Sequence, residues 1–133
     1  MYLDPRQFIA AVRAEAAENP DKVYLPPLVW DEDEDDFVAT DECVYVERDH
    51  GTGELVGSCI VGRALIRCGV PAEKLDVFGI SFSTLAARLG IELHPSIIEW
   101  GDCVQDRQDS GVPWSEAIEI ADSEFPELVV EVV

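Results

Sequence analysis

The sequence predicts a mainly helical α+β fold, in which five or six short helices pack around a small β-hairpin. Apolar residues recur at helical spacing in several segments that are bounded by capping residues or prolines, and one intervening segment has β-favouring residues around a Gly-rich turn. The hydrophobic share of 47% is ordinary for a folded protein. Since 133 residues are typical of one domain, we expect residues 1–133 to form a single globular unit.

The first helix is predicted to begin at Pro5, with Asp4 as its cap, and to end before Asn19-Pro20. Its apolar residues recur at helical spacing: Phe8, Ile9, Val12 and Ala16. The paired prolines Pro26-Pro27 then predict an extended segment that lies on the core.

A β-hairpin is predicted next. Cys43 to Val46 are mostly β-favouring residues, residues 49–53 are dense in turn formers, and residues 54–56 supply the returning strand.

The following helix is expected to run from a cap at Ser58 through Cys68, with Gly69 ending it. Gly62, inside this helix, indicates close approach by another backbone or by an aromatic ring. Residues 71–78 are expected to form a further helical turn or two.

Three more helices are predicted toward the C-terminal end. One is capped by Ser81 or Ser83 and ends at Gly90, the longest begins at Pro95 and stops at residues 110–111, and the last begins at Pro113. The apolar residues 128–133 have β propensity and are expected to add a strand to the hairpin or to form an exposed edge.

The formal charge is -19, and it is concentrated in two blocks. Residues 31–57 hold eleven acidic side chains against one basic, and residues 100–133 hold nine against one, whereas residues 58–99 are balanced. This balance opposes direct binding to nucleic acid or to an anionic membrane, because phosphate contacts need Lys and Arg. With no long apolar stretch and no secretory pattern at its start, the chain is expected in the cytoplasm.

The densest acidic run is Asp31, Glu32, Asp33, Glu34, Asp35 and Asp36. Six adjacent like charges repel one another, which disfavours a tightly paired strand or a packed helix and predicts an acidic loop at about 31–36. Three interpretations stay open: a solvated loop, a docking site for a basic protein surface, and a calcium site. The calcium loop pattern fails at its glycine position, which Asp36 occupies.

A second acidic set is Asp102, Asp106 and Asp109, whose spacing of four and three places them on one side of a helix. They are candidates for contact with a basic partner, or they form the solvated face of an amphipathic helix.

The four cysteines, at 43, 59, 68 and 103, include no closely spaced pair of the kind that structural zinc sites use. Buried structural thiols are the expected state, and we expect no metal and no cofactor. A nucleophilic role is conceivable for Cys59, at a helix start, with His50 as its base. The glycines at 51, 53 and 57 do not form a phosphate-binding motif, since the accompanying Lys is missing.

Three blocks of sequence carry a resemblance: Cys43-Val44-Tyr45, residues 57–65 (beginning Gly-Ser-Cys-Ile-Val-Gly) and residues 104–114 (containing Gln-Asp-Ser-Gly-Val-Pro-Trp). On these blocks the chain resembles a family of small uncharacterised proteins of actinobacteriophages and their hosts, and the resemblance covers about residues 40–122. The resemblance implies that the shared blocks build the core and that Gln108 and Trp114 meet at a corner, and it implies no reaction.

These observations favour a non-enzymatic phage-type protein that binds a basic host protein through its carboxylates and imitates the charge of DNA. The predicted contact residues are the two acidic sets, 31–36 and 102, 106 and 109, and no residue is predicted to be catalytic. Two alternatives stay open: a small enzyme that uses Cys59 and His50, and an ordinary acidic domain adapted to high salt. The oligomeric state is left open.

Overall fold

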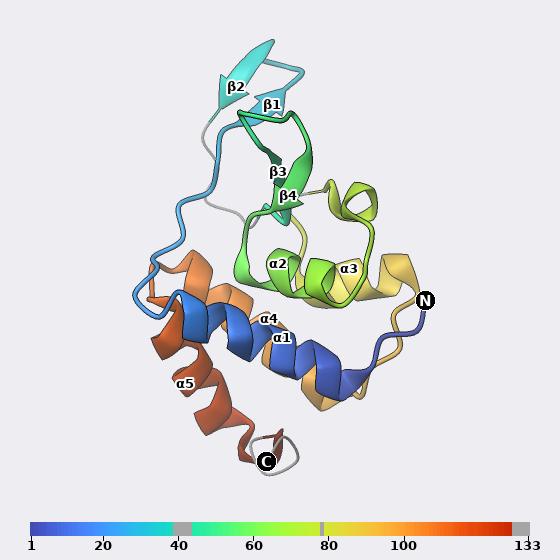
Figure 1. The fold of residues 1–133 in the computed structure, drawn as a ribbon, viewed down its shortest axis with the longest axis vertical. Helices are drawn as coiled ribbons and strands as arrows, with labels where there is room; N and C mark the ends of the chain where they lie inside the picture. The colour runs from blue at the N-terminus through green and yellow to red at the C-terminus, as the bar shows by residue number, and fades with distance from the viewer. Residues whose placement is uncertain (39–43, 78, 129–133) are drawn as a thin grey trace.

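The structure is a computed structural model that describes residues 1–38, 44–77 and 79–128, and in these ranges the chain is mainly helical (Figure 1). The helices are α1 (Pro5–Glu18), α2 (Ile60–Arg67), the 3-10 helix η1 (Ala72–Leu75), α3 (Phe82–Leu89), α4 (Pro95–Asp109) and α5 (Trp114–Glu124). The strands are β1 (Val29–Asp31), β2 (Asp36–Val38), β3 (Val46–Arg48) and β4 (Leu55–Gly57). The predicted mainly helical α+β class is confirmed. The predictions for Cys43, Phe78 and residues 129–133 concern positions outside the described residues. Leu128, with which the predicted C-terminal strand begins, is buried in a helical turn instead.

The helix boundaries follow the capping signals of the sequence. Asp4 accepts hydrogen bonds from the backbone amides of Arg6 and Gln7 at the start of α1, and Ser81 Oγ accepts one from the amide of Thr84 at the start of α3. Gly90 ends α3 in the left-handed conformation, with φ of 67°, which glycine adopts without steric cost. These predicted ends are confirmed.

The start of α2 differs by one residue from the prediction. Its N-cap is Cys59, whose Sγ accepts a hydrogen bond from the amide of Gly62 at 3.4 Å. Ser58 does not cap the helix, because its hydroxyl is bonded instead to the side chains of Tyr24 and Glu47.

The core lies between the helices. Phe8 of α1 stacks on Phe82 of α3 with ring centroids 5.0 Å apart, and it meets the edge of Trp100 of α4 at 6.5 Å. Trp100 and Trp114, the latter at the start of α5, are fully buried. Burial of such large aromatic side chains is the main stabilising contribution of this helical body.

The strands form two antiparallel hairpins, of which the sequence predicted one. In the predicted hairpin, Val46 pairs with Gly57 and Arg48 pairs with Leu55. In the other hairpin, Val29 pairs with Val38 and Asp31 pairs with Asp36. Figure 1 shows both hairpins at one end of the helical body, with β1 and β2 farthest from it.

Gly62 brings the β3–β4 hairpin against α2. A Cβ at this position would lie well inside the contact distance of the carbonyl oxygen of Tyr45, the residue before β3. The predicted close approach of another backbone is therefore confirmed. Nearby, the amide of Ser58 donates to the same carbonyl oxygen at 2.9 Å, so the end of β4 and the start of α2 are both fixed to this strand.

Candidate functional site

The acidic run forms the tip of the β1–β2 hairpin. Asp31 and Asp36 lie in paired strands and the four residues between them form the turn. The prediction that repulsion disfavours paired strands is therefore wrong at both ends of the run, whereas residues 32–35 form the predicted loop. Glu32 to Asp36 are exposed, and water screens the repulsion between exposed charges strongly.

Local hydrogen bonds hold this turn. Asp31 Oδ1 accepts from the amide of Asp33 at 2.9 Å, and Asp36 Oδ1 accepts from the amide of Phe37 at 2.8 Å. Asp35 has φ of 50°, the left-handed region that aspartate tolerates better than most side chains. The turn is therefore built from the acidic residues themselves.

The carboxylates of residues 31–36 have no ion pair with the described part of the chain, whereas the helical body pairs several of its own. The ion pairs join Arg13 to Asp122, Arg63 and Arg67 to Glu15, Arg67 to Glu18, and Arg107 to Glu124. The hairpin thus presents uncompensated negative charge.

Apolar side chains lie beside the acidic turn. Leu28, just before β1, is 62% exposed, and Phe37 in β2 is 58% exposed. Surfaces that combine charge with large exposed apolar groups are typical of protein contact sites. Sequence reasoning missed these two residues, although Phe37 directly follows the acidic run and Leu28 lies three residues before it.

The second acidic set is used mainly inside the molecule. Asp102 Oδ1 accepts from the amide of Ser83 at 3.1 Å, at the first turn of α3, and Asp109 Oδ1 accepts from Gln108 Nε2 at 2.8 Å. Only Asp106 of this set is exposed. The structure places this set on α4 in the helical body, apart from the β1–β2 hairpin (Figure 1).

Gln108, which the sequence analysis placed at a corner of the core, supports the fold. Gln108 is fully buried, and its Oε1 accepts from the backbone amide of Ile60 at 2.8 Å, which satisfies a donor in the first turn of α2. Its contacts are thus part of the fold.

The candidate pair Cys59 and His50 is not brought together by any hydrogen bond among the described residues. Cys59 is fully buried at the start of α2, whereas His50 is exposed in the turn between β3 and β4. A thiol needs a nearby base to act as a nucleophile, so this arrangement gives the enzymatic alternative no support.

The other described thiols are weak acids. Burial, with a hydrogen bond to Glu124 and its negative charge, raises the pKa of Cys103 to about 11. Burial, with the charge of Asp4, raises the pKa of Cys68. Both thiols are protonated near neutral pH and are poor nucleophiles. Within residues 1–38, 44–77 and 79–128, no group of three or more His, Cys, Asp or Glu side chains could hold a metal ion.

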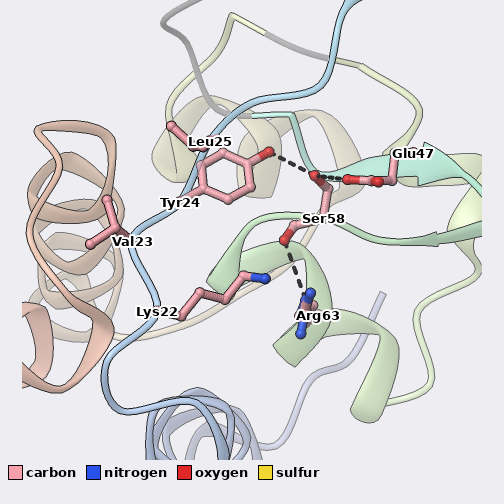
Figure 2. Close-up of a pocket in the computed structure, with 7 residues that line it drawn as sticks. All are labelled: Lys22, Val23, Tyr24, Leu25, Glu47, Ser58 and Arg63. Atoms are coloured by element: carbon pink, nitrogen blue, oxygen red, sulfur yellow. Dashed lines mark hydrogen bonds between the residues drawn. The ribbon is translucent and has the colours of Figure 1, made fainter.

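A pocket of about 270 Å³ lies where the segment after α1 crosses β3 and the start of α2 (Figure 2). Its lining residues are Lys22, Val23, Tyr24, Leu25, Glu47, Ser58 and Arg63. Five of these seven side chains are polar or charged, so the pocket can offer hydrogen bonds and charges to a ligand.

Two buried hydroxyls connect one side of this pocket. Ser58 Oγ donates to Glu47 Oε2 at 2.6 Å, and it lies 2.7 Å from the hydroxyl of Tyr24. Tyr24 also reaches the carbonyl oxygen of Val44 at 3.1 Å. Because Tyr24 and Ser58 are 5% and 1% exposed, their bonds fix the position of the Glu47 carboxylate.

Two cations occupy the other side. Lys22 Nζ lies 5.5 Å and Arg63 Cζ 5.2 Å from the centre of the Trp114 ring. Arg63 Nε also donates to the carbonyl oxygen of Ser58 at 3.3 Å. Lys22 has no ion pair within the described residues. Sequence reasoning missed this pocket, because its residues come from segments that are far apart in the sequence. The one feature that could have drawn attention to it is Lys22, since the chain has only two lysines.

No protein-family model, curated protein sequence or solved structure matches this chain. The resemblance to actinobacteriophage proteins therefore stays a prediction. Among the described helices, none has the length and apolar character needed to cross a membrane.

Proposed function

We propose that the protein binds a basic protein surface through the tip of the β1–β2 hairpin. The observation that carries this proposal is that six adjacent carboxylates, residues 31–36, have no ion pair with the described part of the chain. Uncompensated charge of one sign accelerates the encounter with an oppositely charged partner and makes binding sensitive to salt.

Leu28 and Phe37 add apolar contacts to the proposed interface. Exposed ion pairs contribute little free energy, whereas burial of an aromatic or aliphatic side chain at an interface contributes substantially. The carboxylates are therefore expected to orient and attract the partner, and the two apolar side chains to hold it.

The partner class follows from the charge density of the hairpin. Six charges on two short strands and their turn occupy about 10 Å, given a rise of about 3.3 Å per residue. This is about one charge per 1.7 Å, the density of duplex DNA. A DNA-binding protein of the host is accordingly the proposed partner, and the protein acts as a phage-type imitation of DNA charge in the host cytoplasm.

The test compares two sets of charge removals. In one variant the six acids at 31–36 are replaced by Asn or Gln. In the control, six exposed acids elsewhere are replaced in the same way: Glu73, Asp76, Glu92, Glu99, Glu116 and Glu119. Proteins are captured from actinobacterial lysate on the immobilised chain, identified, purified and titrated by calorimetry with all three chains at low and moderate salt.

The hairpin variant is expected to bind a captured DNA-binding protein at least about a hundredfold more weakly than the natural chain, and the control less than about tenfold more weakly. Duplex DNA is expected to compete for the same partner. Equal loss in both variants, or capture of no basic protein, contradicts the proposal.

A further inference from the structure

We propose that the pocket of Figure 2 binds a small zwitterion that carries one carboxylate and one ammonium group, the chemical class of a free amino acid. The inference rests on the charges of the pocket and is independent of the partner of the β1–β2 hairpin.

The cationic side of the pocket suits a carboxylate. Lys22 lies in the segment after α1 and Arg63 in α2, yet both approach the ring of Trp114. Both side chains also line the pocket, so an anion bound there is attracted by two positive charges. In a chain of charge -19, Lys22 nevertheless has no anionic partner within the described residues, although Arg63 NH1 lies 3.8 Å from Glu15.

The anionic side suits an ammonium group. Glu47 Oε2 accepts the hydrogen bond from Ser58, and Glu47 Oε1 has no hydrogen-bond partner within the described residues. The buried hydroxyls of Ser58 and Tyr24 hold the carboxylate in one orientation (Figure 2). A pre-oriented acceptor binds a charged donor without the entropy loss that ordering would cost.

Both charges together select the ligand class. A simple anion such as phosphate is attracted by Lys22 and Arg63 but repelled by Glu47. A simple amine is attracted by Glu47 but repelled by the two cations. A zwitterion satisfies both sides at once.

The size of the pocket limits the ligand. About 270 Å³ lies just below the range of about 300–1,000 Å³ that is usual for sites of drug-sized ligands, so the ligand is small. Val23 and Leu25 also line the pocket, but Figure 2 shows their side chains turned away from those of Lys22 and Tyr24, so the ligand's contacts are mainly polar.

The test begins with the natural chain and the twenty amino acids, each measured by ligand-detected NMR. The tightest binder is then compared by calorimetry with its deaminated acid, its decarboxylated amine and inorganic phosphate. We expect the amino acid to bind at least about tenfold more tightly than any of the three, because each lacks one charge-assisted contact or meets repulsion.

Variants assign the binding to this pocket. Lys22→Met and Glu47→Gln are each expected to weaken binding about tenfold or more. Lys74→Met is the matched control, because Lys74 is the other lysine of the chain and lies exposed in η1. Binding by none of the amino acids, equal binding of the acid or of phosphate, or equal loss in the Lys74 variant overturns the proposal.

Discussion

The two hairpins are built alike but packed differently against the rest of the chain. Each has two strands of three residues and a turn held by an aspartate that accepts backbone hydrogen bonds, Asp31 in one and Asp49 in the other. β4 packs on α2 and η1, whereas β1 and β2 contact mainly each other.

The difference shows what fixes a short hairpin in place. Three-residue strands are marginal by themselves, so a hairpin becomes rigid only when the core or a partner covers it. The β3–β4 hairpin has the core beneath it, through Tyr45, Val46 and Ser58, all buried. The β1–β2 hairpin has exposed carboxylates and Phe37 instead, which suits a surface that acquires its cover on binding.

The largest effect is expected from Gly62→Ala. A methyl group at this position collides with the backbone carbonyl of Tyr45, and the strand or α2 must shift, at a cost of about 3 kcal/mol or more. Chemical denaturation measures the loss, and hydrogen exchange should show faster exchange at β3 and β4 with little change at β1 and β2.

The control for this change is Gly51→Ala, in the exposed turn, where the added carbon meets only the flexible Asp49 side chain. It should cost less than about 1 kcal/mol. If both hairpins lose protection equally in the Gly62 variant, they fold as one unit and the comparison fails.

A moderate effect is expected from Tyr24→Phe, which removes the hydroxyl bonded to Ser58 and to the Val44 carbonyl. Loss of these buried contacts should reduce the free energy of unfolding by about 1–2 kcal/mol. Tyr2→Phe is a matched control, since Tyr2 is 84% exposed. A Tyr24 variant as stable as this control would show that the hydroxyls do not fasten the β3–β4 hairpin.

The smallest effect concerns the Asp49 turn. Hydrogen bonds from the backbone amides of Gly51 and Thr52 lower the pKa of Asp49 below its ordinary value. The stabilisation of the turn is therefore present above the ordinary aspartate pKa and is lost as the pH falls through the lower, folded pKa. In an NMR pH titration, the amide signals of Gly51 and Thr52 should move together, with a midpoint below the usual aspartate range. A midpoint at or above that range contradicts the hydrogen-bonded geometry.

Most of the helical framework was predictable because its signals are local. Asp4 with Pro5, Ser81, Gly90 and Pro95 each mark a helix end through the conformation or hydrogen bonding of one residue. The predicted α2 cap at Ser58 is wrong because the competing partners of that hydroxyl, Tyr24 and Glu47, lie 34 and 11 residues away in the sequence.

The β1–β2 hairpin was not predicted because the repulsion expected among residues 31–36 was given more weight than the β-favouring residues on either side of them. Val29 and Trp30 before the run, and Phe37 and Val38 after it, are β-favouring residues, and they pair in the structure. The pocket could not be predicted at all, since Lys22, Glu47 and Arg63 become neighbours only through the tertiary fold.

The position of Trp114 gives the protein an internal chromophore. Its indole is shielded from solvent but lies within 6 Å of two side-chain charges, and the emission wavelength of an indole depends on the electric field across its ring. The emission of Trp114, one of three tryptophans in the chain, can therefore report changes around Lys22 and Arg63 without an attached dye.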